Sequence, residues 1–225
     1  RARHHQHDHL HEDREVVEQQ AADKEGEETP SQRLAHAFHQ VVVAKGVLTA
    51  AEIQAGVEAM DASAGNIAGP RIVAKAWVDP AFKELLLKDA TAACTQLGVS
   101  ASNSTAHTVL TVVENTEAVH NLVVCTLCSC YPRSILGLAP QWYQSRNYRA
   151  RAVLEPRGVL QEFGTQLPAG MQLRVHDSTA DLRYVVLPRR PAGTEGWPED
   201  KLALLVTRDS MIGVADPLPP SALTE

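Results

Sequence analysis

The sequence predicts an α+β protein in which strands pack between helical layers. Helical periodicity, capping residues and glycine stops cover much of the first hundred residues. From Thr108 onward, runs rich in β-branched residues alternate with further helical segments. Hydrophobic residues make up 44% of the 225 residues, so the chain can bury the core of one globular domain and still carry extensions.

The first 28 residues differ in composition from the rest. They contain five histidines, nine acidic and four basic residues, and few large apolar side chains. Such a segment buries too little apolar surface to offset its ordering entropy, so we expect residues 1–28 to be a His-rich, acidic, disordered tail or linker. Its histidines are either solvated or help to load a metal. The first residue is not methionine, which fusion to an upstream chain would explain.

The distribution of charge and hydropathy excludes several classes of partner. Residues 1–28 carry −5 of the formal charge of −6, so the remainder is nearly neutral and lacks the basic stripe that binds nucleic acid. No apolar run approaches the roughly 20 residues needed to cross a bilayer, and no signal peptide is visible. We therefore expect a cytoplasmic protein that contacts neither nucleic acid nor membrane.

Residues 29–69 are predicted to form a helical arm. Thr29 and Pro30 begin a helix that runs to about Ala44 and that Gly46 ends. A capping box then opens a second helix. Because the apolar faces of the arm precede the compact body, we expect them to contact a partner subunit. The capping box consists of Thr49 and Glu52, and the apolar face of the second helix of Ile53, Val57 and Met60.

Residues 70–225 are predicted to form a compact domain that binds the metal and carries the catalytic site. Asp79 caps its second helix and Gly98 ends it. The expected helices span 71–77, 80–97, 140–154, 156–163 and 198–208. The expected strands span 108–114, 121–125, 172–176, 183–187 and 211–215.

Three of the four cysteines lie within six residues, directly after an apolar run. Cys125, Cys128 and Cys130 therefore lie where a strand ends and the chain turns, which is a suitable place for a metal-binding loop. Cys94 stands alone in a helical pattern, and we expect it to be a buried apolar residue without a functional role. Four cysteines so distributed in a cytoplasmic protein argue against a disulfide framework.

The spacing Cys-x-x-Cys-Ser-Cys favours a mononuclear site. A zinc site normally draws two pairs of ligands from separate places, and the expected body has no second pair. An iron–sulfur cluster would need a fourth thiolate, and a redox disulfide would need only two. The remaining local donors are the backbone nitrogens of Ser129 and Cys130, which a trivalent ion can deprotonate. Three sulfurs and two amidates then leave one coordination position open.

The stretch VCTLCSCYP at residues 124–132 resembles the metal-binding signature of nitrile hydratase α subunits and of their relative, the thiocyanate hydrolase γ subunit. The resemblance covers roughly residues 30–215 and implies a layered α-β-β-α domain of the nitrile hydratase α-subunit type. Its other main stretches are RIVAKAW at 71–77, YRAR at 148–151, EPR at 155–157, RYVVLP at 183–188, RPAGTEGW at 190–197 and VTRDS at 206–210.

The resemblance also implies the chemistry of the site. Thr126 after the first cysteine favours one non-corrin, low-spin Co(III) per chain over Fe(III). Cys125 would stay a thiolate, whereas Cys128 would become a sulfinic and Cys130 a sulfenic acid. Arginines of a partner β subunit would bind the sulfur-bound oxygens. That subunit would be separate or fused upstream, in an αβ heterodimer or α2β2 heterotetramer, with a metallochaperone or activator as a further possible partner.

The activity implied by the family is hydration of a small nitrile to an amide. Cys130, Ser129 and Cys128 are the expected catalytic residues, with either the Cys130 sulfenate oxygen or an activated water as the nucleophile. Arg133 stands where nitrile hydratases often have tryptophan and would suit a small anion, which keeps a thiocyanate hydrolase γ-type subunit as the alternative. A structural metal-binding or redox-sensing module is the non-enzymatic alternative.

Residues near the cluster allow two interpretations each. Helical arginines orient the cluster or its partner, or form ordinary ion pairs. A strand-end aspartate is an acid close to the metal or the cap of a turn. The aromatic pair either packs beneath the cluster or at the subunit interface, or contacts the substrate directly. These residues are Arg149, Arg151, Arg157, Asp177, Trp142 and Tyr143.

Overall fold

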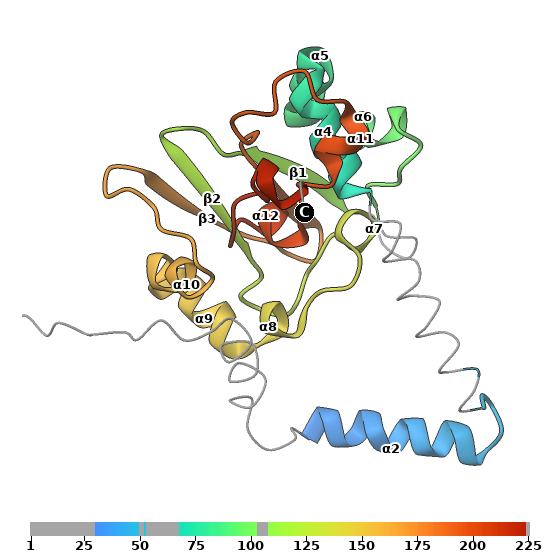
Figure 1. The fold of residues 1–225 in the computed structure, drawn as a ribbon. Coiled ribbons are helices and arrows are strands. Elements are labelled where there is room, and N and C mark those ends of the chain that lie inside the picture. Colours follow the sequence, from blue (N-terminus) through green and yellow to red (C-terminus); the bar gives the residue numbers. More distant parts are fainter. Residues whose placement is uncertain (1–29, 50–51, 53–67, 103–107, 224–225) are drawn as a thin grey trace, which may run out of the picture.

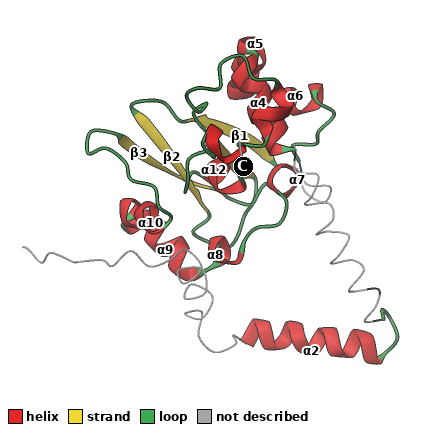
Figure 2. Cartoon of the chain, in the orientation of Figure 1, coloured by secondary structure: helices red, strands yellow, loops and turns green. Residues whose placement is uncertain are grey.

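The computed structural model describes residues 30–49, 52, 68–102 and 108–223 (Figure 1; Figure 2). Its helices span Pro30–Ala44 (α2), Gly69–Val78 (α4), Pro80–Lys88 (α5), Ala90–Gln96 (α6), Arg133–Leu136 (α7), Gln141–Gln144 (α8), Arg146–Leu154 (α9), Pro156–Glu162 (α10), Glu199–Ala203 (α11) and Arg208–Ile212 (α12). A 3₁₀ turn covers Pro220–Leu223 (η1). The strands are Val109–Glu114 (β1), Val119–Val124 (β2), Gln172–Asp177 (β3) and Leu182–Leu187 (β4). The α+β class is confirmed.

The N-terminal helix of the predicted arm is confirmed as α2, and Gly46 follows it with a φ of +65°. The capping box also forms, because Thr49 N donates to Glu52 Oε2 at 2.7 Å and Glu52 N donates to Thr49 Oγ1 at 3.1 Å. Leu34 and Phe38 on α2 are 71% and 69% exposed. The predicted tail and the apolar face of the second arm helix lie outside the described residues.

The predicted helix 80–97 is wrong as a single element, because it is divided into α5 and α6 at Asp89. The Asp89 side chain accepts a hydrogen bond from Ala92 N at 2.9 Å, and its backbone leaves the helical region at φ −146° and ψ 87°. The predicted ends hold, since Asp79 caps α5 through Phe82 N and Gly98 follows α6 with a φ of +70°. A local side-chain cap therefore interrupts a continuous helical pattern.

The strands form two parallel pairs, β1 with β4 and β2 with β3. The chain crosses from one pair to the other in two connections, residues 115–118 between β1 and β2 and residues 178–181 between β3 and β4. Helices α5 and α6 pack against β1, helices α9 and α10 against β2 and β3, and α12 against both pairs. The strands therefore lie between helices, as predicted. The expected strand 121–125 instead begins at Val119 and ends at Val124, so Cys125 already lies outside it.

The predicted helix 140–154 is likewise divided, here at Ser145. The Ser145 backbone is extended, at φ −63° and ψ 144°, and its hydroxyl accepts a hydrogen bond from Tyr148 N at 3.1 Å. The short α7 was not expected from the pattern. The predicted helix 156–163 is confirmed as α10, after which Gly164 adopts a φ of +82°.

The predicted strand 211–215 is wrong, and the preceding helix 198–208 ends early at Ala203. Thr207 and Ser210 form a reciprocal capping box that begins α12, and Gly213 ends this helix with a φ of +89°. Met211 and Ile212 are each 1% exposed because they lie on the buried side of a helix rather than on a strand.

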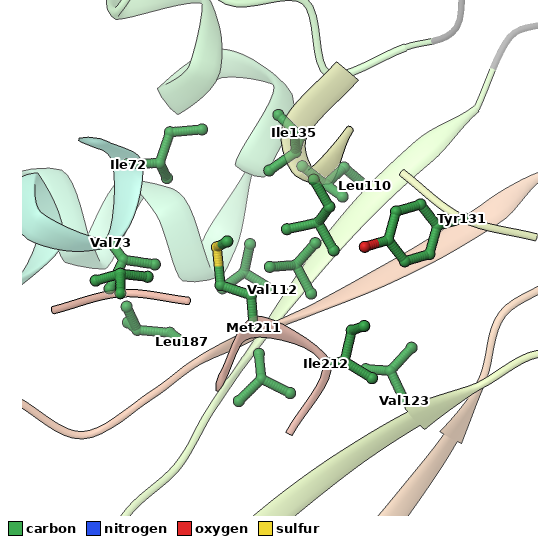
Figure 3. Packing of buried hydrophobic residues seen from close by; sticks show 14 of the residues in the cluster. Ile72, Val73, Leu110, Val112, Val123, Tyr131, Ile135, Leu187, Met211 and Ile212 are labelled. Atoms are coloured by element: carbon green, nitrogen blue, oxygen red, sulfur yellow. The ribbon is translucent and has the colours of Figure 1, made fainter. Parts of the chain in front are cut away.

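The core lies between α4, α7, α12 and the strands (Figure 3). Met211 and Ile212 of α12 point toward side chains of β1, β2 and α4, while the Tyr131 ring lies at the edge of the same cluster. The residue after the last cysteine is therefore packed into the core. Among the described residues, no helix is both long and apolar enough to span a membrane.

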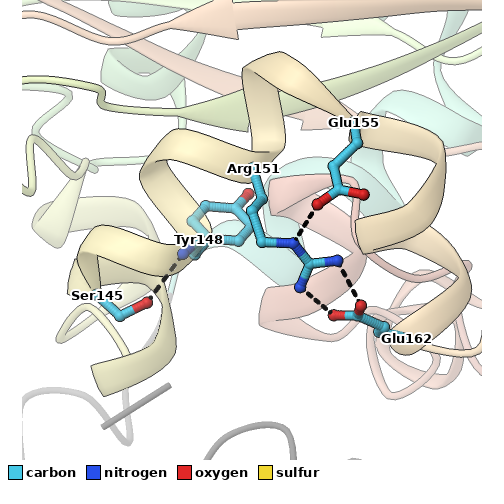
Figure 4. A network of polar contacts seen from close by, with 5 residues as sticks. All are labelled: Ser145, Tyr148, Arg151, Glu155 and Glu162. Atoms are coloured by element: carbon cyan, nitrogen blue, oxygen red, sulfur yellow. Dashed lines mark hydrogen bonds and ion pairs between the residues drawn. The ribbon is translucent and has the colours of Figure 1, made fainter. Parts of the chain in front are cut away.

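An ion-pair network joins α9 to α10 (Figure 4). Arg151 Nη1 and Nη2 donate to the two carboxylate oxygens of Glu162 at 2.8 and 2.5 Å, and Arg151 Nε donates to Glu155 Oε1 at 2.6 Å. These contacts raise the pKa of Arg151, chiefly through the hydrogen bonds that its guanidinium donates to Glu162. Arg151 thus forms the ordinary ion pairs that were one of its two interpretations.

We expect Arg151→Lys to lower the free energy of unfolding by about 1 kcal/mol, because an ammonium cannot make the two parallel bonds to Glu162. The pair is partly exposed, so the difference should shrink at high salt. Urea unfolding at low and high salt measures both effects. Arg149→Lys is the control, since Arg149 Nε donates to the backbone carbonyl of Ser145 at 3.4 Å. Equal losses in both variants would contradict the role of the network.

Candidate metal centre

The three clustered cysteines follow the end of β2 and converge on one point. Val124 O accepts a hydrogen bond from Ser178 N at 2.7 Å, which is the last link to the neighbouring strand. The Cys128 sulfur then lies 3.4 Å from the Cys125 sulfur and 3.1 Å from the Cys130 sulfur, and all three lie within 4.8 Å of one another. Within the described part of the chain this is the group of side chains that can hold a metal ion.

The sulfur separations discriminate between coordination geometries. Sulfurs bound at about 2.3 Å to one ion lie about 3.3 Å apart at right angles and about 3.8 Å apart at tetrahedral angles. The separations of 3.1 and 3.4 Å fit right angles better. These two separations are compatible with donors bound at right angles to one ion.

The cluster is open on one side. Cys125 is 1% and Cys130 9% exposed, whereas Cys128 is exposed and Leu127 beside it is 84% exposed. An apolar side chain so exposed beside a reactive cluster is a typical contact point for another molecule. A ligand or partner can reach the centre from the side of Cys128.

The thiols of Cys128 and Cys130 titrate as an interacting pair. Hydrogen bonding from the Cys130 thiol, and secondarily from Cys125, lowers the pKa of Cys128. Hydrogen bonding from the backbone N–H groups of Cys130 and Ser129 contributes to this lowering. Burial raises the pKa of Cys130 to about 12, and the hydrogen bond that its thiol donates to Cys128 adds to the increase.

Asp177 at the end of β3 accepts two hydrogen bonds from Thr126, the residue after the first cysteine of the cluster. Its Oδ1 accepts a hydrogen bond from Thr126 N at 2.9 Å and its Oδ2 one from Thr126 Oγ1 at 2.5 Å. The parallel register places Val124 opposite Asp177, so the carboxylate reaches the residue two positions beyond the strand. Asp177 thus contacts the loop directly, and its predicted role near the metal gains a structural basis.

We expect Asp177→Ala to lower the free energy of unfolding by about 1 kcal/mol through the lost hydrogen bonds. The same change should weaken metal binding by the cluster about 10-fold, because it releases a residue between two ligands. Chelator competition measures the affinity, and thermal unfolding measures the stability. Asp181→Ala is the control, since this exposed carboxylate in the β3–β4 connection makes no hydrogen bond to the described residues. Similar metal affinities in both variants would contradict the prediction.

The predicted aromatic pair packs beneath the cluster. Tyr143 is 0% and Trp142 3% exposed, and the Tyr143 hydroxyl donates to the Cys130 carbonyl at 3.0 Å. Burial raises the pKa of Tyr143, so this hydroxyl remains a hydrogen-bond donor. The Tyr131 ring contacts that of Tyr143 edge to face, with centroids 5.1 Å apart. The first of the two interpretations is therefore confirmed for Tyr143.

Two residues near the cluster received no role from the sequence. Tyr148 donates its hydroxyl to Val123 O at 2.7 Å, just before the cluster. Arg183 is 8% exposed, its positive charge acts on Cys130 to lower the pKa, and its Nε and Nη1 make no hydrogen bond to the described residues. Both belong to stretches that resemble the family, but only the packing of distant elements brings them to the cysteines.

The remaining predicted residues lie apart from the centre or at its edge. Cys94 on α6 is 0% exposed, and burial raises its pKa to about 11, as expected of an unreactive core thiol. Arg133 is exposed at the first position of α7, three residues after Cys130. Its guanidinium is therefore accessible on the C-terminal side of the cluster.

Comparison with known proteins gives consistent matches. Residues 29–215 match the family described as nitrile hydratase, alpha chain. The α subunit of the low-molecular-weight cobalt-containing nitrile hydratase of Rhodococcus rhodochrous is 51% identical over 82% of this chain and 88% of that subunit. The thiocyanate hydrolase γ subunit of Thiobacillus thioparus is 44% identical over 81% of this chain and 78% of that subunit.

A solved structure agrees with these matches. A double mutant of the Fe-type nitrile hydratase from Comamonas testosteroni Ni1 has a TM-score of 0.72 at 39% identity, over 87% of this chain and 94% of that one. The resemblance predicted from the cysteine cluster and its flanking stretches is therefore confirmed, for the sequence and for the fold.

Proposed function

The chain belongs to the nitrile hydratase α-chain family, and we propose that it is the metal-binding subunit of a cobalt-dependent enzyme that hydrates nitriles to amides. The observation that carries the proposal is the convergence of three cysteine sulfurs within 4.8 Å at the open end of β2. The named cobalt-containing relatives and Thr126 after the first cysteine support cobalt rather than iron.

The sulfurs of Cys125, Cys128 and Cys130 would hold one low-spin Co(III) together with the backbone nitrogens of Ser129 and Cys130. The two sulfur separations of 3.4 and 3.1 Å, which are close to those of donors bound at right angles, support this donor set. The bound trivalent ion would supply Lewis acidity that polarises the carbon–nitrogen triple bond.

Cys130 is proposed to act at the nitrile carbon. As a sulfenate, its oxygen would either take a proton from the water that adds to that carbon, or add to the carbon itself. In the second case water would then attack the carbon and cleave the new oxygen–carbon bond, which releases the imidate and regenerates the sulfenate. Cys128, as a sulfinate, and Ser129 would offer hydrogen-bond acceptors at the exposed mouth of the cluster, where substrate approaches. Protonation and tautomerisation of the imidate then give the amide.

A β subunit is proposed to complete the site from the side of Cys128. Exposed Leu127 and the apolar side chains of α2 would contact that subunit. Residues 29–69 would form the contacting arm, and residues 70–225 the catalytic domain. The β subunit is either separate or fused upstream, and the assembly would be an αβ heterodimer or an α2β2 heterotetramer.

Hydrolysis of thiocyanate is the second candidate function. It is favoured by Arg133, whose exposed positive charge lies three residues beyond Cys130 and suits a small anion. The thiocyanate hydrolase γ subunit is 44% identical to this chain. Nitriles remain first because the relatives with higher identity carry nitrile hydratase names.

One experiment separates the candidates. The metal-loaded complex with its β subunit is assayed for amide formation from nitriles and for carbonyl sulfide formation from thiocyanate. We expect amide from nitriles and about one cobalt per chain by elemental analysis. Turnover of thiocyanate alone would favour the second candidate, and turnover of neither by the cobalt-loaded complex would support a structural or redox-sensing role instead.

A further inference from the structure

Two buried tyrosine hydroxyls donate hydrogen bonds to backbone carbonyls at the two ends of the cysteine cluster. Tyr148 of α9 donates to Val123 O at 2.7 Å, and Tyr143 of α8 donates to Cys130 O at 3.0 Å. Both donors are buried, at 4% and 0% exposed. They differ in what they hold, because Val123 lies inside a strand and Cys130 lies in the cluster itself.

The Tyr148 hydroxyl supplies a hydrogen bond to a carbonyl on the edge of β2 that does not pair with β3. Successive carbonyls of a strand point to opposite sides, and Val124 O already accepts from Ser178 on the β3 side. Val123 O therefore points away from β3, where a buried carbonyl needs another donor. The pairing of β2 with β3 still fixes the backbone at Val123, so Tyr148 adds to a position that the sheet already determines.

The Tyr143 contact has no such support. Residues 125–130 belong to no helix or strand, so no ladder of backbone hydrogen bonds fixes the carbonyl of Cys130. The carbonyl carbon and the Cβ of Cys130 are bonded to the same Cα, so a displacement of this part of the loop moves the carbonyl, the Cα and the sulfur together. A donor that fixes the carbonyl therefore limits where the sulfur can lie.

The Tyr143 hydroxyl is itself held rigidly. Its ring lies 5.1 Å from that of Tyr131, 6.0 Å from that of Trp142 and 5.6 Å from that of Tyr148, measured between centroids. A buried ring among three aromatic neighbours has little freedom to follow a moving loop.

We propose that Tyr143 is a positioning residue for the metal centre, which sets the orientation of the Cys130 sulfur through its hydrogen bond to the Cys130 carbonyl. This inference rests on the proposed function, in which that sulfur is a ligand and carries the reacting oxygen. Tyr143 touches neither substrate nor metal and acts through Cys130.

The test is Tyr143→Phe in the cobalt-loaded complex with the β subunit, because phenylalanine keeps the buried ring and removes only the hydroxyl. We expect the thiolate-to-cobalt absorption bands to shift, and kcat to fall about 10- to 100-fold with KM changed about 2-fold or less. Bands and kcat equal to those of the wild type would overturn the inference.

Tyr148→Phe is the matched control, since it removes the same group from the same aromatic cluster. We expect both variants to lower Tm by similar amounts, and Tyr148→Phe to keep the absorption bands and kcat of the wild type. Equal band shifts in the two variants would assign the effect to general loosening and overturn the inference. If the wild-type complex hydrates no nitrile, the proposed function fails, while the comparison of absorption bands still tests Tyr143.

Discussion

Replacing Cys128 by serine is expected to remove stoichiometric cobalt from the complex and to lower kcat/KM for nitriles by about 10³-fold or more. The Cys128 sulfur is the central member of the cluster, with one sulfur neighbour at 3.4 Å and the other at 3.1 Å. A serine hydroxyl does not ionise near neutral pH and is a poor ligand for an ion that thiolates hold. Lewis-acid polarisation contributes several kcal/mol, which corresponds to about 10³-fold in rate.

Elemental analysis and the amide assay measure the two effects, with Cys94→Ala as the control. Cys94 is also buried and is the remaining cysteine, but it lies on α6 within the core. We expect Cys94→Ala to lose about 1 kcal/mol of stability from reduced packing and to keep its cobalt. Full cobalt content and turnover in Cys128→Ser would show that the metal centre lies elsewhere.

Replacing Gly213 by alanine is expected to lower the free energy of unfolding by about 4 kcal/mol or more, or to prevent folding. Gly213 ends α12 in the left-handed region, and a Cβ there would lie 2.0 Å from Asn121 O and 3.2 Å from Leu122 Cα. Both neighbours are backbone atoms of β2, so neither can turn aside. Relief would require α12 to separate from the strand that leads to the cysteines.

Gly98→Ala isolates the conformational part of this cost. Gly98 also has a positive φ, of +70°, but a Cβ there would meet nothing within 4 Å. We expect a loss of about 1 kcal/mol from the left-handed backbone alone. Urea unfolding of the two variants gives the comparison, and a similar small loss in both would falsify the proposed close approach of α12 to β2.

Local signals in the sequence were sufficient for most helix ends. Asp79 caps α5, the capping box of Thr49 and Glu52 forms, and Gly46 and Gly98 follow the ends of α2 and α6, as predicted. Such signals are local because a cap or a left-handed glycine satisfies backbone groups within a few residues. The cysteine cluster could be predicted for a similar reason, since the three cysteines lie within six residues and their sulfurs lie within 4.8 Å of one another in the structure.

Long-range packing decided the elements that the sequence left ambiguous. The apolar run from Met211 suits a strand or a buried helix, and packing against both strand pairs makes it a helix. The breaks at Asp89 and Ser145 replace two long predicted helices with four short ones. Here a side-chain cap competes with continuation of the helix, and tertiary contacts of the next segment decide between them.

The chain by itself therefore determined the class of fold, several helix ends and the three cysteines that can hold a metal ion. Only the tertiary structure decided what surrounds those donors. Asp177 reaches Thr126 through the parallel register of β2 and β3, and Tyr143 reaches Cys130 from a separate helix. Contacts between residues 13 to 51 positions apart depend on how elements pack, and no local pattern specifies that packing.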